Sequence, residues 1–138
     1  MPNILILGGG AAGLAAALAA AQSAPAAQVI VLERNPKPGK KLLATGNGRC
    51  NLDNTGIAPE DVLALLEHHL AQHHVQLRTG CTVRTLNQSR SGYAVQFETA
   101  GGSAETLRAD AVICAMGGEA GPQFGTDGFG TRFAAQCG

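Results

Sequence analysis

Residues 3–13 read NILILGGGAAG, and this stretch decides the fold of the chain. Its apolar first half, Asn3–Leu7, predicts a strand buried on both faces. Ala11–Gln22 is almost entirely alanine and leucine and predicts a helix. Gln28–Leu32 is β-branched and apolar and predicts a second buried strand. A strand, a helix and a strand in this order predict a right-handed crossover between parallel neighbours.

The glycines between the first strand and the helix have the spacing of a dinucleotide-binding turn, Gly8-x-Gly10-x-x-Gly13. In such a turn Gly8 permits the tight bend, Gly10 lets a pyrophosphate approach the backbone, and Gly13 allows the helix to pack closely on the strand. The free backbone N–H groups at the start of the helix, around Ala11 and Ala12, are then expected to hold the phosphates.

Glu33 ends the second strand, twenty residues after Gly13. An acid at this place accepts hydrogen bonds from the ribose hydroxyls of the bound adenosine and repels a 2′-phosphate, which argues against NADP. Arg34 follows it and weakens that second argument. The alternative is an ordinary glycine turn, with Glu33 a solvated strand end.

The remaining chain predicts an α/β fold: a doubly wound, Rossmann-like parallel sheet with a small antiparallel β-meander. We expect a single dinucleotide-binding domain over residues 1–138, with the meander inserted at about 82–108. The parallel strands should be completed by Val75–Thr79 and Ala111–Ala115. The other expected elements are a helical turn near Lys40–Leu43, helices at Pro59–His73 and Gly128–Gln136, and meander strands at Thr82–Leu86, Tyr93–Glu98 and Glu105–Arg108.

Composition excludes several classes of protein. The formal net charge is zero, from 10 basic and 10 acidic residues, so no nucleic-acid partner is expected. Ile4–Ala21 lacks charged side chains, but its glycines and weakly hydrophobic alanines argue against a membrane span. It also lacks the basic start of a signal peptide.

The metal-binding residue types are not spaced as a site. The four cysteines form no CxxC pair, so neither a zinc site nor a disulfide framework is expected, and a cytoplasmic protein with free thiols is the simplest interpretation. Cys114, within a predicted strand, is expected to be an ordinary core residue. His69 and His73 are four residues apart on a predicted helix, without a third ligand, and are interpreted as part of a polar face.

Three later segments carry a resemblance to a known family. Residues 39–51 read GKKLLATGNGRCN, residues 112–118 read VICAMGG, and residues 125–130 read GTDGFG. In this order they resemble the BaiN-like, or aminoacetone-oxidase-like, family of bacterial FAD-binding flavoproteins. The resemblance implies that the dinucleotide is FAD.

The family pattern also implies roles for individual residues. Lys40 and Lys41 would approach the pyrophosphate, Arg49 would hold a phosphate or a reduced flavin, and the backbone of Val83 would meet the adenine edge. The remaining implied contacts to the flavin or ribityl chain are Thr45, Gly46, Asn47, Gly48, Ala115, Met116, Gly117 and Asp127. Met116 stands where the family usually has Thr, so only a backbone role is expected there.

The resemblance implies an FAD-dependent oxidoreductase, with NAD(P)H or a small-molecule amine or redox compound as reaction partner. The chain departs from the family in lacking the substrate-side segment and the C-terminal part. We therefore also consider a non-catalytic dinucleotide-binding fragment, an NAD-binding domain that serves a partner chain, and self-association. No catalytic residue is identified from the sequence.

Overall fold

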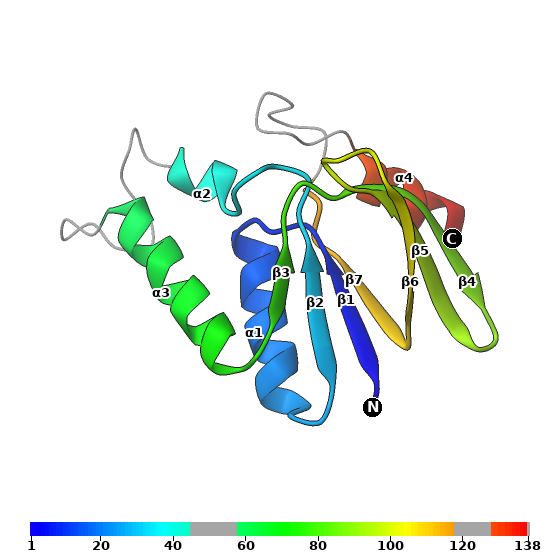
Figure 1. The fold of residues 1–138 in the computed structure, drawn as a ribbon, viewed down its shortest axis with the longest axis horizontal. Coiled ribbons are helices and arrows are strands. Elements are labelled where there is room, and N and C mark those ends of the chain that lie inside the picture. Colours follow the sequence, from blue (N-terminus) through cyan, green and yellow to red (C-terminus); the bar gives the residue numbers. More distant parts are fainter. Residues whose placement is uncertain (45–57, 118–127, 138) are drawn as a thin grey trace.

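A computed structural model describes residues 1–44, 58–117 and 128–137, and Figure 1 shows their arrangement. Its centre is a parallel sheet with the strand order β3-β2-β1-β7. The β1 strand lies between β2 and β7, and both neighbours run parallel to it. These strands span Asn3–Leu7 (β1), Gln28–Leu32 (β2), Gln76–Arg78 (β3) and Ala111–Cys114 (β7).

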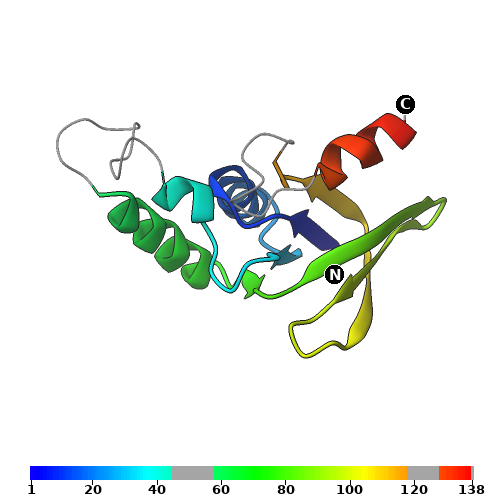
Figure 2. The same cartoon turned by 90° about the horizontal axis from the view of Figure 1, so that it is seen from above.

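The two faces of this sheet are covered by different kinds of element (Figure 2). Helices α1 (Ala11–Ser23) and α3 (Pro59–Gln72) lie on one face. An antiparallel sheet with the order β4-β5-β6 lies on the other. Its strands span Thr82–Ser89 (β4), Gly92–Glu98 (β5) and Ala104–Ala109 (β6).

The alternation of side chains along β1 divides the core into two parts. Leu5 and Leu7 join the cluster that contains the fully buried Val95 and Phe97 of the meander. Ile6, between them in sequence, joins the cluster formed with α1 and α3. Because both faces are covered, β1 is apolar from Ile4 to Leu7, which is why its sequence shows a continuous run instead of alternation.

The structure confirms the fold class and the elements predicted from the sequence, with shifts of a few residues at their ends. Two short elements complete the described chain, α2 (Lys40–Leu43) and α4 (Phe129–Cys137). Within the described residues, every helix is too short or too polar to cross a membrane.

Candidate cofactor site

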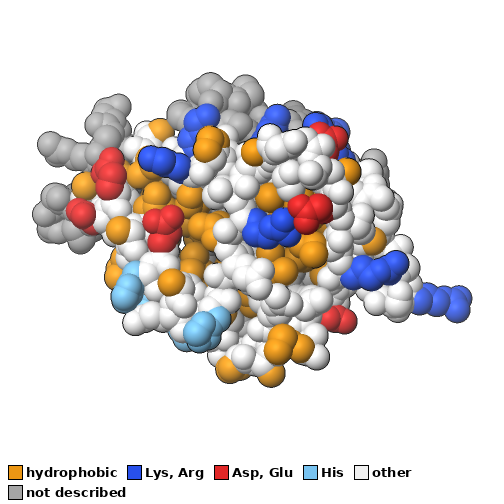
Figure 3. Space-filling model, in the orientation of Figure 1, with side chains coloured by type: hydrophobic (Ala, Val, Ile, Leu, Met, Phe, Trp, Pro, Cys, Tyr) orange, Lys and Arg blue, Asp and Glu red, His pale blue; other side chains and the backbone are white. Residues whose placement is uncertain are grey.

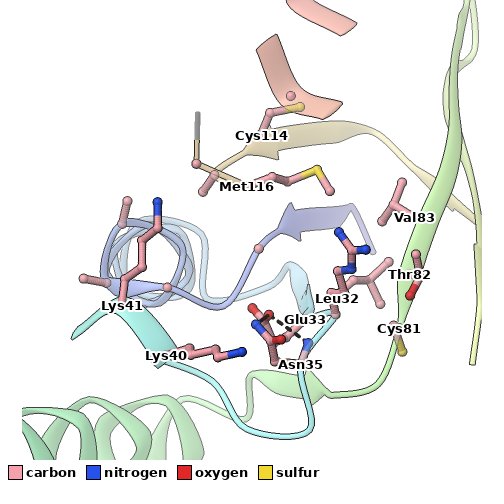
Figure 4. Close-up of a pocket in the computed structure, with 18 of the residues that line it drawn as sticks. Leu32, Glu33, Asn35, Lys40, Lys41, Cys81, Thr82, Val83, Cys114 and Met116 are labelled. Atoms are coloured by element: carbon pink, nitrogen blue, oxygen red, sulfur yellow. Dashed lines mark hydrogen bonds between the residues drawn. The ribbon is translucent and has the colours of Figure 1, made fainter. Parts of the chain in front are cut away.

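A pocket of about 800 Å³ opens at the carboxyl ends of β1, β2 and β7 (Figure 4). This is the end of a parallel sheet where the loops after the strands gather and where ligands of such folds bind. The volume is within the range of sites for small organic ligands. The pocket is lined by Gly8, Gly10, Ala11, Ala12, Leu32, Glu33, Arg34, Asn35, Lys40, Lys41, Leu42, Cys81, Thr82, Val83, Cys114, Ala115, Met116, Gly117, Gly130, Thr131 and Ala134.

The three fingerprint glycines have different surroundings. A Cβ on Gly13 would lie 1.8 Å from the carbonyl oxygen of Gly8, so α1 packs directly on the turn. A Cβ on Gly8 would lie 2.3 Å from the carbonyl oxygen of Ala115, and Gly8 has a φ of +109°. A Cβ on Gly10 would meet nothing within 4 Å. Of the three, Gly10 is therefore the glycine whose missing side chain leaves room for a ligand.

Helix α1 begins beside this open space. Gly10 is its N-cap, and the carbonyl of Gly10 accepts the first helical hydrogen bond, from the backbone of Leu14 at 2.9 Å. The first turn contains no acidic side chain, and no side chain caps the helix. The positive end of the helix dipole thus faces the pocket with no acidic side chain in the helix's own first turn, which suits a phosphate.

Glu33 is the buried charged residue of the site, with 8% of its surface exposed. Its Oε2 accepts a hydrogen bond from the backbone nitrogen of Gly9 at 2.6 Å. Its Oε1 accepts two from Asn35, one from the backbone nitrogen at 3.0 Å and one from the side-chain Nδ2 at 3.2 Å. Figure 4 shows this carboxylate among the residues that line the pocket.

The loop after Glu33 is tied to the glycine turn at a second point. The backbone nitrogen of Gly39 donates to the carbonyl of Gly9 at 2.7 Å, so the two polar groups of the Gly9 backbone are bound, one by Glu33 and the other by this loop. Gly39 has a φ of +72°, a conformation that favours glycine. It directly precedes α2, which carries Lys40 and Lys41 into the lining of the pocket.

Basic side chains add positive charge to the pocket, since Arg34, Lys40 and Lys41 all line it. Elsewhere the charges are mixed: acidic and basic side chains are interspersed on the face shown in Figure 3. Among the described residues, no group of three or more His, Cys, Asp or Glu side chains is placed to hold a metal ion.

The structure gathers most of the predicted site residues in one place. Glu33, Arg34, Lys40, Lys41 and the backbone around Val83 line the pocket, as do the other predicted residues Gly8, Gly10, Ala11, Ala12, Ala115, Met116 and Gly117. Gly13 lies outside the lining and has a packing role. The remaining predicted residues lie outside the described residues: Thr45, Gly46, Asn47, Gly48, Arg49 and Asp127.

Sequence reasoning missed Asn35 and misjudged Cys114. Asn35 has no fingerprint spacing of its own; its signal is its position two residues after the acid, where it can bond back to the carboxylate. The prediction that Cys114 is a core residue is wrong, because this cysteine is exposed and lines the pocket. It is the last residue of β7, at the open end of the sheet.

Cys81 is the second thiol of the pocket and is buried. Burial raises the pKa of the Cys81 thiol above its ordinary value; the nearby Arg78 partly opposes this rise, and Glu105 adds to it. The thiol lies 3.5 Å from the carbonyl of Thr79, to which it donates. A protonated, buried thiol is a packing group and a weak nucleophile.

Two family models match the sequence. The model for the flavin containing amine oxidoreductases matches residues 43–120, more than half of the chain. The model for the HI0933-like protein Rossmann domain matches residues 2–64, which include the glycine turn and Glu33. The expectation of a flavoprotein is thereby confirmed.

Two curated proteins are similar in sequence. A 3-dehydro-bile acid delta(4,6)-reductase of Clostridium scindens is 34% identical; the alignment covers all of this chain and 44% of the reductase. A ribosomal RNA dihydrouridine synthase of Escherichia coli is 36% identical over 66 residues, which are 48% of this chain and 16% of the synthase. The chain therefore spans less than half the length of either relative.

Among solved structures, part of the flavin-dependent monooxygenase PieE, determined in complex with FAD and substrate, has the same fold as this chain. The TM-score is 0.65 with 19% sequence identity, over 85% of this chain and 30% of the monooxygenase. At 19% identity this likeness supports the α/β fold alone.

Proposed function

Because the chain belongs to the flavin-containing amine oxidoreductase family, we propose that it binds FAD in this pocket and serves as the cofactor-binding part of an oxidoreductase. The observation that carries the proposal is the pairing of open space at Gly10 with a buried carboxylate at Glu33 on the same pocket. These are the two features that the ADP half of a dinucleotide requires.

In the proposed complex the pyrophosphate lies over Gly10 and the start of α1, where Lys40 and Lys41 add positive charge. The adenosine ribose lies at Glu33, and the adenine lies toward Cys81–Val83. When bound, FAD supplies the electron transfer, and the protein supplies binding, orientation and electrostatics.

Glu33 fits this role by its hydrogen-bond capacity. An ionised carboxylate has about four acceptor positions. Three are filled, by the Gly9 and Asn35 nitrogens. A ribose hydroxyl can use the remaining one, and a 2′-phosphate would meet a buried negative charge instead. The site therefore favours FAD or NAD over NADP, and the family favours FAD.

We expect the substrate of the whole protein to be determined by residues outside the part that it shares with these relatives. The two relatives are named for a bile acid and for ribosomal RNA, yet this chain aligns with both, over its full length with the reductase and over 48% of its residues with the synthase. The shared part is therefore the common cofactor-binding unit. The reaction partner, whether NAD(P)H, an amine or another redox compound, stays a prediction, as do the roles of the flavin-side residues from Thr45 to Arg49 and of Asp127.

The test is titration of the cofactor-free chain with FAD, ADP, NAD and NADP by calorimetry. We expect FAD to bind with the highest affinity and NADP to bind with the lowest. Glu33→Gln should weaken ADP binding by ~1–3 kcal/mol, the cost of leaving a buried polar partner unsatisfied. A ranking of NAD above FAD, or unchanged ADP affinity in Glu33→Gln, would reject the proposal.

A further inference from the structure

Asn35 stands out among the pocket residues because both of its nitrogens point to the same carboxylate oxygen. The backbone nitrogen lies 3.0 Å and the side-chain Nδ2 lies 3.2 Å from Oε1 of Glu33. Figure 4 shows Asn35 beside Glu33 among the residues that line the pocket. This pair of bonds fixes one oxygen of the carboxylate from one side.

The other carboxylate oxygen is fixed by a different segment of the chain, the glycine turn. Oε2 of Glu33 accepts the 2.6 Å hydrogen bond of the Gly9 backbone. A planar carboxylate that is held at both oxygens cannot rotate about its terminal torsion, which is otherwise broad. Glu33 is therefore presented to the pocket in one orientation before any ligand binds.

The backbone around Asn35 is itself anchored. The carbonyl of Asn35 accepts a hydrogen bond from the backbone of Gly80 at 3.1 Å. The carbonyl of Glu33 accepts a hydrogen bond from the backbone nitrogen of Cys81 at 2.8 Å. The backbone nitrogen of Glu33 donates to the carbonyl of Arg78, also at 2.8 Å. The loop after β2 is thus held against the short connection between β3 and β4. The backbone of Asn35 is therefore fixed in position by hydrogen bonds.

We propose that Asn35 is a positioning residue for ribose recognition: its side chain orients the Glu33 carboxylate so that the remaining acceptor position of that carboxylate meets a ribose hydroxyl. This inference rests on the proposed function, because it assumes that the ADP half of a dinucleotide binds at Glu33. Preorganisation of this kind raises affinity by removing the cost of ordering the acceptor at the moment of binding.

The side-chain bond can be removed without the backbone bond. Asn35→Ala keeps the backbone nitrogen and deletes only Nδ2. We expect ADP affinity to fall about three- to tenfold, the size of one hydrogen bond. Asn35→Asp should weaken ADP binding further, because a second carboxylate would then face Oε1 across a distance near 3.2 Å. Asn87→Ala, which removes the same group from an exposed position on β4, is the control and should bind ADP normally.

A ligand without ribose hydroxyls distinguishes a general structural role of Asn35 from a positioning role. The same variants are titrated with 2′,3′-dideoxy-ADP, which lacks the ribose hydroxyls. If Asn35 acts through Glu33, Asn35→Ala and the parent chain should bind the dideoxy ligand equally. Equal losses for ADP and for the dideoxy ligand would overturn the inference, and so would unchanged ADP affinity in Asn35→Ala.

Glu33→Gln distinguishes the failure of this inference from failure of the proposed function. If Glu33→Gln weakens ADP and Asn35→Ala does not, the positioning role is wrong while the site stands. If neither variant changes ADP affinity, the proposed function itself is wrong. Thermal unfolding of each variant without ligand checks that a loss of affinity is measured on folded protein.

Discussion

Oε2 of Glu33 and the backbone nitrogen of Gly9 are joined by a buried hydrogen bond of 2.6 Å across 24 residues of sequence. This bond connects the end of β2 to the glycine turn after β1. The bond holds the glycine turn in place, and in the proposed function the same carboxylate also offers an acceptor to the ligand. The first role affects the stability of the cofactor-free chain, and the second affects the affinity for a ligand.

For Glu33→Ala we predict a loss of stability in the cofactor-free chain. The substitution leaves the Gly9 nitrogen without its partner, and an unsatisfied buried donor costs ~1–3 kcal/mol. Glu33→Gln should lose less, because its amide oxygen still accepts one bond. Urea unfolding in the absence of nucleotide measures both; equal stability of the parent chain and Glu33→Ala would show that the bond contributes nothing.

A second prediction concerns Arg78, which links the parallel sheet to the meander. One terminal nitrogen of its guanidinium lies 3.1 and 3.2 Å from the two carboxylate oxygens of Glu105, and its central carbon lies 5.1 Å from the ring centre of the buried Phe97. Arg78→Met keeps much of the apolar stem and removes both charge interactions. We expect a loss of ~1–2 kcal/mol in the free energy of unfolding.

The matched control for Arg78 is Arg84→Met. Arg84 lies 3.1 Å from Glu98, but both side chains are about half exposed and the pair covers no aromatic ring in the described structure. Exposed pairs contribute ~0–1 kcal/mol. If the two variants were equally stable, the contact between Arg78 and Phe97 would make no measurable contribution to the free energy of unfolding.

A third prediction follows from the raised pKa of the Cys81 thiol. Because burial raises that pKa, the folded chain keeps the thiol neutral at pH values where the unfolded chain ionises it, from about pH 8.5 upward. The unfolded state then binds fewer protons than the folded state, so stability falls as pH rises through this window. Below it, Cys81 adds no pH dependence.

The measurement is urea unfolding at pH 7 and pH 10 for the parent chain and Cys81→Ala. We expect the variant to be less stable at pH 7, because it loses buried volume, but to lose less stability between the two pH values.

At pH 8, iodoacetamide should modify the exposed Cys114 before the buried Cys81, as followed by peptide mass spectrometry. Preferential modification of Cys81 would contradict the expected order of reactivity.

How far the site could be predicted depends on how local its signals are. The glycine turn and Glu33 were found from the sequence because each stands at a fixed spacing from a strand end. Asn35 was missed because its proposed role depends on a side chain that turns back to the carboxylate two residues before it, which spacing does not reveal. Cys114 was misplaced because an apolar run predicts burial, whereas only the structure shows that this residue ends β7 at the pocket.

The final prediction compares two glycines of one fingerprint, Gly10 and Gly13. Gly10 has a φ of −79° and a ψ of −173°, which alanine adopts without strain, and its Cβ would enter open space. The Cβ of Gly13 would lie 1.8 Å from the Gly8 carbonyl oxygen, so α1 must move away from the turn. The gain in helix propensity on replacing Gly by Ala is at most ~1 kcal/mol and cannot offset that displacement.

We therefore expect opposite outcomes from the same chemical change. Gly10→Ala should unfold at the same urea concentration as the parent chain but lose at least ~1.4 kcal/mol of FAD affinity, a factor of ten, because the new methyl group occupies the space of the pyrophosphate. Gly13→Ala should lose ~1–3 kcal/mol of stability or more from overpacking. Normal FAD affinity in a folded Gly10→Ala chain would mean that the phosphates do not lie over this turn.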